Sequence, residues 1–123
     1  MSLPTNHPVF TRMLDSYSPS VGASPVVSYM RAPVRGRVGK FACILGGTLT
    51  GDATVTVANV TSGVTIGTFV LTASGSVGGS MFQGTPTSIA SMQVNEDDVI
   101  SFTSASGTGA SIPGHYSMSF RAA

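Results

Sequence analysis

Charged residues are scarce in this sequence of 123 residues. They make up 9% of the chain, whereas a typical soluble domain contains about 25%. Hydrophobic residues reach 41%, so serine, threonine and glycine fill most of the places that charged side chains usually take. Like charge is what normally keeps soluble domains apart. We therefore expect the chain to work within an assembly.

Residues that carry metal or nucleophilic chemistry are also few, with one cysteine and two histidines. Cys43 lies between Phe41 and Ile44 in an apolar run, which predicts a small buried side chain and not a reactive thiol. His7 and His115 form no zinc-type spacing with Cys43 or with acidic residues. We expect a protein that is not an enzyme and needs neither a metal nor a cofactor.

The only dense carboxylate group is Glu96-Asp97-Asp98. Its residues are consecutive and do not alternate as the ligands of a calcium loop do. A solvated turn with a side-chain to backbone hydrogen bond is the favoured interpretation. The glycines at 46–47 and 75–79 are not followed by the Lys-Ser/Thr pair of a phosphate-binding loop.

Long apolar runs are missing as well. No stretch of 18 apolar residues occurs, and residues 1–20 do not show the pattern of a secretory signal. We expect no membrane partner and a chain that is made and kept in a cytoplasm before it assembles.

Short runs of β-branched and aromatic residues dominate the rest of the chain, most clearly between Arg35 and Leu71. Turn clusters such as Gly46-Gly47 and Ser62-Gly63 separate the runs. The sequence predicts strands near 25–31, 38–45, 52–60, 64–71, 87–94, 99–103 and 115–121, with a turn at 95–98. Alternating residues Ala53, Val55 and Val57 indicate a half-exposed sheet.

Seven or eight short strands without a confident helix predict an all-β fold, an antiparallel β-sandwich. A jelly roll is the first choice and an immunoglobulin-like sandwich the second. A chain of this length buries roughly two-thirds of the surface of its unfolded form, which is enough for one domain. We expect two parts, an extended N-terminal arm at residues 1–24 and a jelly-roll-like sandwich at 25–123.

The arm contains three prolines, which disfavour helix around them. A short helical turn between Pro8 and Pro19 would place five large apolar side chains on one side. These are Val9, Phe10, Met13, Leu14 and Tyr17. The many polar residues around them prevent a core of their own, so we expect the arm to dock onto a partner; the alternative is that it packs on its own domain.

Charge is unevenly distributed along the chain. Residues 1–40 carry five basic residues and one acid, a sum of +4, and residues 41–123 carry one basic residue and four acids, a sum of −3. The basic cluster consists of Arg31, Arg35, Arg37 and Lys40. Without interleaved exposed aromatics it is a weak nucleic-acid footprint. An acidic protein patch is the expected partner, with Arg31, Arg35 and Arg37 as contacts.

Several motifs between Gly36 and Phe120 resemble a known family. They are Leu45-Gly-Gly-Thr-Leu-Thr-Gly-Asp-Ala-Thr, the glycine-rich Ala73-Ser-Gly-Ser-Val-Gly-Gly-Ser, and Val94-Asn-Glu-Asp-Asp-Val-Ile-Ser-Phe. This pattern is similar to the small β-sandwich capsid decoration proteins of tailed bacteriophages, also called cement or head-fibre proteins. The resemblance covers about two-thirds of the chain.

The resemblance implies a structural protein of the virion that binds the outer surface of an icosahedral head. It implies contacts that hold neighbouring major capsid protein subunits together, and a homo-dimer or homo-trimer assembled in the host cytoplasm. A tail-fibre or head-fibre module that binds a receptor or carbohydrate is the alternative. Such modules stack sugars on exposed aromatics, and this sequence has no tryptophan.

Overall fold

The computed structural model describes residues 11–18, 21, 26–106 and 112–122. These residues form nine strands and one short 3-10 turn, η1. The strands are β1 (Thr11–Ser18), β2 (Val26–Arg31), β3 (Gly36–Leu45), β4 (Ala53–Asn59), β5 (Val64–Leu71), β6 (Met81–Gly84), β7 (Gln93–Val94), β8 (Val99–Ser106) and β9 (Gly114–Ala122), with η1 at Ala90–Met92.

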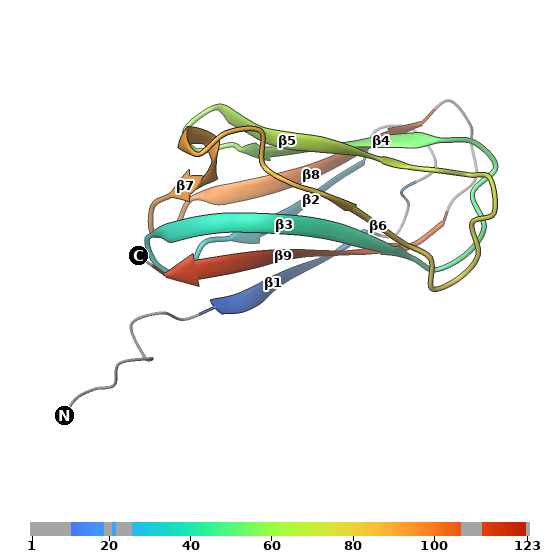
Figure 1. The fold of residues 1–123 in the computed structure, drawn as a ribbon, viewed down its shortest axis with the longest axis horizontal. Coiled ribbons are helices and arrows are strands. Elements are labelled where there is room, and N and C mark those ends of the chain that lie inside the picture. Colours follow the sequence, from blue (N-terminus) through green and yellow to red (C-terminus); the bar gives the residue numbers. More distant parts are fainter. Residues whose placement is uncertain (1–10, 19–20, 22–25, 107–111, 123) are drawn as a thin grey trace.

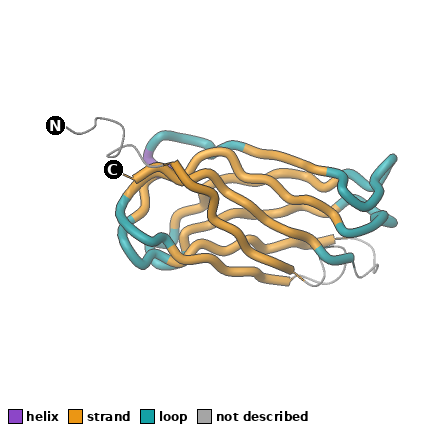
Figure 2. The backbone as a smooth tube through the Cα atoms, turned by 90° about the horizontal axis from the view of Figure 1, so that it is seen from below, coloured by secondary structure: helices purple, strands orange, loops and turns teal. Residues whose placement is uncertain are grey.

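Two antiparallel sheets pack face to face (Figures 1 and 2). Sheet A has the strand order β1-β9-β3-β6, with β7 also pairing with β3, and sheet B has the order β2-β8-β4-β5. The pairs β1·β9, β2·β8, β3·β6 and β4·β5 are nested, as in one long hairpin that has been rolled up. This nesting is the topology of a jelly roll, because an immunoglobulin sandwich places its first two strands side by side in one sheet. The predicted all-β jelly-roll-like sandwich is confirmed.

Alternation along the strands builds the core. On β4, Ala53, Val55, Val57 and Asn59 are all buried, as the sequence predicts. On β9 the buried positions are Tyr116, Met118 and Phe120. β3 follows the same rule on both sides of an irregularity between Val38 and Phe41, where its register with β9 shifts.

One predicted strand is wrong. The stretch 87–94 is not a strand, because only Gln93–Val94 pairs with β3 and Ala90–Met92 forms η1. The strand in this region is β6, which ends just before Pro86, a residue without an N–H to donate. The segment after β6 instead covers the free edge of β5, where the Thr87 amide donates to the Ile66 carbonyl at 2.9 Å.

The boundary of the N-terminal arm also requires correction. Thr11–Ser18 is neither helical nor detached, because it pairs along its whole length with β9 as an edge strand of sheet A. Leu14 packs against the hydrophobic core. The sandwich therefore begins at Thr11 within the described residues, and the expected boundary after residue 24 is wrong for this segment.

Asp98 supports the end of the sandwich at which β7 turns into β8. Its Oδ2 accepts hydrogen bonds from Asn59 Nδ2 and from the Asn95 amide, both at 2.9 Å. Asp98 and Asn59 are buried, whereas Glu96 and Asp97 are exposed. The predicted turn and its side-chain hydrogen bond are present, but the carboxylate that makes the bond is not solvated.

We predict that Asp98→Ala lowers the free energy of unfolding by about 2 to 3 kcal/mol, because the buried Asn59 amide loses its acceptor. Urea denaturation measures the change. Glu96→Ala in the same turn is the matched control and should change stability by no more than about 0.5 kcal/mol, since its side chain is exposed. Equal effects of the two substitutions would show that Asp98 has no special structural role.

The hydroxyl of Tyr116 is the other notable polar group of the core. It is fully buried, and among the described residues no hydrogen bond of ordinary geometry reaches it; the Ser104 side chain interacts with it only weakly, and the Tyr116 ring stacks on Phe102 at 4.7 Å between centroids. An unsatisfied buried hydroxyl is destabilising. We predict that Tyr116→Phe raises the free energy of unfolding by about 1 kcal/mol. Tyr29→Phe, at an exposed tyrosine, should leave stability unchanged, and a loss of stability in Tyr116→Phe would contradict the prediction.

Candidate interaction surface

The outer face of sheet A carries an exposed apolar row. Strand pairing brings Tyr17, His115, Ile44 and Met81 into register across β1, β9, β3 and β6. Tyr17 is 61% exposed, Ile44 43% and Met81 52%. Met13 lies two positions before Asp15 on the same face and is 56% exposed. Large apolar side chains that share one face of a sheet mark an interaction site.

The opposite end of this face is basic. Arg37 on β3 is in register with Arg121 on β9, and exposed Lys40 follows at the irregularity in β3. Among the residues that the structure describes, none of these three cations forms an ion pair. Among the described strand residues of sheet A, the only acid is Asp15, whose Oδ1 lies 3.9 Å from His115 Nε2. Three cations against one carboxylate leave this face with uncompensated positive charge.

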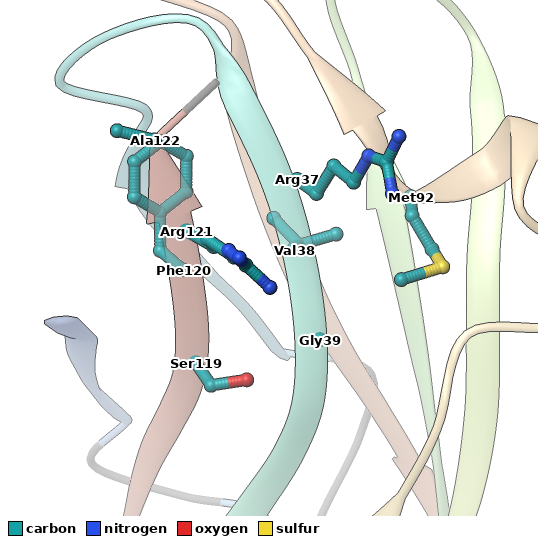
Figure 3. A pocket seen from close by; sticks show the side chains of 8 residues that line it. All are labelled: Arg37, Val38, Gly39, Met92, Ser119, Phe120, Arg121 and Ala122. Carbon is teal, nitrogen blue, oxygen red and sulfur yellow. The ribbon is translucent and has the colours of Figure 1, made fainter. Parts of the chain in front are cut away.

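A groove of about 540 Å³ runs along the basic end (Figure 3). It arises where β3 leaves regular pairing, because β7 pairs with β3 only as far as Arg37 and β6 only from Phe41 onward. Figure 3 shows Arg121 projecting from β9 toward β3 and Arg37 projecting toward Met92. The guanidinium fork suits a carboxylate, and Met92 and Ala122 add apolar lining. The groove is thus suited to an acidic segment with apolar neighbours.

The predicted contact residues fall into separate places. Met13, Tyr17 and Arg37 lie together on the outer face of sheet A, but Leu14 points into the sandwich. Arg31 lies on the other sheet, where Arg31 Nη1 is 3.6 Å from Asp97 Oδ1. Arg35 is exposed in the turn between β2 and β3. Val9 and Phe10 lie outside the described residues.

Sequence reasoning did not single out Arg121, Ile44, Met81 or His115 as members of this surface. Ile44 had a usable signal, because it alternates with buried Cys43 and Leu45 on β3. Arg121 had none, since its proximity to Arg37 depends on the pairing of β3 with β9. The residues of this face come together through the pairing of the strands of sheet A, and no local sequence motif marks them.

Chemical sites other than an interaction surface have little support in the described part of the chain. No group of three histidine, cysteine or acidic side chains there could hold a metal ion. No helix among the described residues is long and apolar enough to cross a membrane. Cys43 is completely buried, which confirms the prediction of a core side chain.

Comparison with known proteins supports the fold. One chain of the cyanophage Pam1 capsid asymmetric unit is similar, with a TM-score of 0.55 and 11% identity, over 100% of this chain and 92% of that chain. Two looser similarities carry no argument. They are a chain of the Bacillus endospore appendage pili (TM-score 0.48, 16% identity, 99% of this chain and 96% of that chain) and a chain of infectious bursal disease virus, Gx strain (0.35, 14%, 93% and 32%).

No protein-family profile and no curated protein sequence matches this chain. The chain therefore has a jelly-roll sandwich fold that also occurs in a phage capsid, and at 11% identity the similarity concerns the fold alone. The capsid chain is only slightly longer than this one, so the similarity covers nearly the whole of a small single-sandwich chain.

Burial of Cys43 predicts a dependence of stability on alkaline pH. Burial raises the pKa of the Cys43 thiol from its ordinary value of 9.0 to about 12, and a backbone hydrogen bond at His115 opposes the rise only in part. Burial also raises the pKa of Tyr116. As pH rises above 9.0 the unfolded thiol loses its proton first, so stability is full below pH 9 and falls as pH approaches 12.

We predict a loss of at most about 1.4 kcal/mol per pH unit from this one group. Urea denaturation at several pH values above 8 measures the slope. Cys43→Ala should flatten it, and combining this change with Tyr116→Phe should flatten it further. An unchanged slope in both variants would contradict the assignment of alkaline destabilisation to these groups.

Proposed function

We propose that this chain is a structural, non-catalytic protein of a phage particle. In this role it binds the outer surface of an icosahedral head and stabilises contacts between major capsid protein subunits. The observation that carries the proposal is the outer face of sheet A, which joins an exposed apolar row to three cations that form no ion pair with any described residue. The full-length fold similarity to a chain of a phage capsid asymmetric unit supports it.

The chemistry of the face fits a protein partner with acidic groups. Arg37, Lys40 and Arg121 would contact carboxylates at one end, and Tyr17, Ile44 and Met81 would be buried at the other. Burying one large apolar side chain contributes roughly 1.5 to 3 kcal/mol. Binding that favours the assembled lattice stabilises it by mass action, without any chemical step. Repetition over many copies multiplies a weak contact.

The N-terminal arm fits the same arrangement. Thr11 opens β1 and pairs with Arg121 on β9, so the chain enters sheet A at its basic end. Residues 1–10, including Val9 and Phe10, precede this point. We propose that they extend the contact with the capsid, while β1 anchors them to the sandwich.

A receptor-binding or carbohydrate-binding module is the less favoured alternative. Sugar sites use aromatic rings that lie together on one surface. Among the described residues, the strongly exposed aromatics are Tyr17 and Tyr29, which alternation places on the outer faces of different sheets. A nucleic-acid site is disfavoured for a related reason, because among the described residues the one aromatic side chain at the basic end of sheet A, Phe120, is buried and cannot stack on a base.

We predict that the double substitution Arg37→Glu with Arg121→Glu strongly reduces occupancy on phage heads. The two new carboxylates would then face an acidic capsid patch, and like-charge contacts cost several kcal/mol. Binding of purified protein to heads that lack it, followed by cryo-microscopy, measures occupancy. Raising the salt concentration should weaken binding of the unmodified protein, because exposed charges are screened.

Arg31→Glu is the matched control, because Arg31 lies on sheet B and already pairs with Asp97. Its occupancy should match that of the unmodified protein. Arg35→Glu tests whether the turn between β2 and β3 reaches the capsid. Full occupancy of the Arg37/Arg121 double variant would exclude this face as the docking surface, and heads without density for the unmodified protein would end the proposal.

A further inference from the structure

The outer face of sheet B is almost free of charge. Strands β4, β5 and β8 contain no Asp, Glu, Lys, Arg or His. The only charged side chain on β2 is Arg31 at its last position, and Asp97 pairs with it. The outer face of a sheet that contacts water normally carries charged or strongly polar side chains. This surface instead presents threonine, valine and alanine.

The outward-facing residues of sheet B form regular rows across its four strands. The central row consists of Val27, Thr103, Thr56 and Thr68, in register on β2, β8, β4 and β5. Tyr29 at 59%, Val27 at 42% and Val70 at 49% exposed add apolar surface around it. Short side chains of this kind allow a second sheet to approach to about 10 Å, the usual spacing of packed sheets.

The edges of the sandwich are less suited to association than this face. At one side, Ser28 Oγ donates to the Tyr17 carbonyl at 2.9 Å, and Ser16 Oγ donates to the Tyr29 carbonyl at 3.1 Å. At the other side, the segment after β6 donates to the Ile66 carbonyl of β5. Covered edges resist strand-to-strand pairing between molecules. Apart from the outer face of sheet A, which we assign to the capsid, the outer face of sheet B is therefore the exposed apolar surface that remains.

We propose that a second copy of this chain packs on the outer face of sheet B, face to face. A neutral face is self-complementary, because a two-fold contact brings the same patch of both copies together without opposing like charges. A charged partner would leave its own charges unpaired against this surface, which is unfavourable. The occupant favoured by charge is thus the chain itself.

The size of the face predicts a weak pair. Four strands about 4.8 Å apart and seven residues of about 3.3 Å each span roughly 450 Å² per copy, or about 900 Å² for both. Stable specific interfaces usually bury more than about 1,200 Å² in total. The pair should therefore form reversibly with rising concentration and not as an obligate dimer.

Pairing through sheet B leaves the two basic faces on opposite sides of the dimer. Such a dimer can contact two acidic surfaces at once. If the proposed capsid function holds, this geometry lets one dimer bridge two capsid subunits. The self-association itself does not depend on that function, and it is tested in solution without phage heads.

Sedimentation velocity from micromolar to millimolar concentration tests the pair. The unmodified protein should shift reversibly from monomer to dimer, with little effect of salt, because the one charged side chain of the face, Arg31, already pairs with Asp97. Thr56→Lys and, separately, Thr68→Lys should each raise the dimer Kd by about tenfold or more, since each brings like charges together. Thr68 is exposed, so this variant keeps the test valid if Thr56→Lys folds poorly.

Ser117→Lys is the matched control, because Ser117 is half-buried like Thr56 but lies on the outer face of sheet A. It should leave the dimer Kd unchanged. Mixing Thr68→Lys with Thr68→Glu protein should restore pairing as a heterodimer. A protein that stays monomeric at millimolar concentration, or an equal loss of pairing in Ser117→Lys, would overturn the proposal. Loss of capsid binding with pairing intact would overturn only the proposed function.

Discussion

A cluster of four aromatic rings joins the two sheets, and the rest of the sandwich depends on it. Phe41 of sheet A lies 5.4 Å from Phe69 and 6.4 Å from Phe102 of sheet B, between ring centroids, and Phe102 stacks on Tyr116 of sheet A at 4.7 Å. Glycines at 67 and 84 make room, because a Cβ at either would come within 2.8 Å of the Phe41 ring. The cluster forms only when both sheets have closed.

Local alternation was enough to predict the strands whose two faces differ sharply. On β4 and β9 most of the buried residues are apolar and most of their neighbours are polar, so the pattern of period two is clear. Cys43 was predictable for the same reason, because it lies between other apolar residues of β3. The sequence of these segments is enough to predict their burial, and their number and spacing predict an antiparallel β-sandwich. The strand pairing then decides for a jelly roll over an immunoglobulin-like topology.

The edge strand β1 could not be predicted in this way. Its outward positions hold Met13 and Tyr17, and Ser16 and Ser18 face inward, which is the reverse of the usual pattern. Ser16 faces inward because it hydrogen-bonds to β2, a contact across the side of the sandwich. The same apolar residues also fit a helical turn, and only pairing with β9 decides between the two. Long-range pairing likewise creates the basic groove, whose two arginines are distant in sequence.

The charge difference between the sheets follows from how a jelly roll distributes its strands. Successive strands β1 to β4 belong to the two sheets in turn. A continuous stretch of charged residues would therefore place charge on the outer faces of both sheets. Instead, β1, β3 and β9 of sheet A carry the charged strand residues, and sheet B has only Arg31. Each face is therefore specified separately by alternate strands. The basic outer face of sheet A suits an acidic partner, and the neutral outer face of sheet B suits a second copy of the chain. The fold places these two faces on opposite sides of the sandwich.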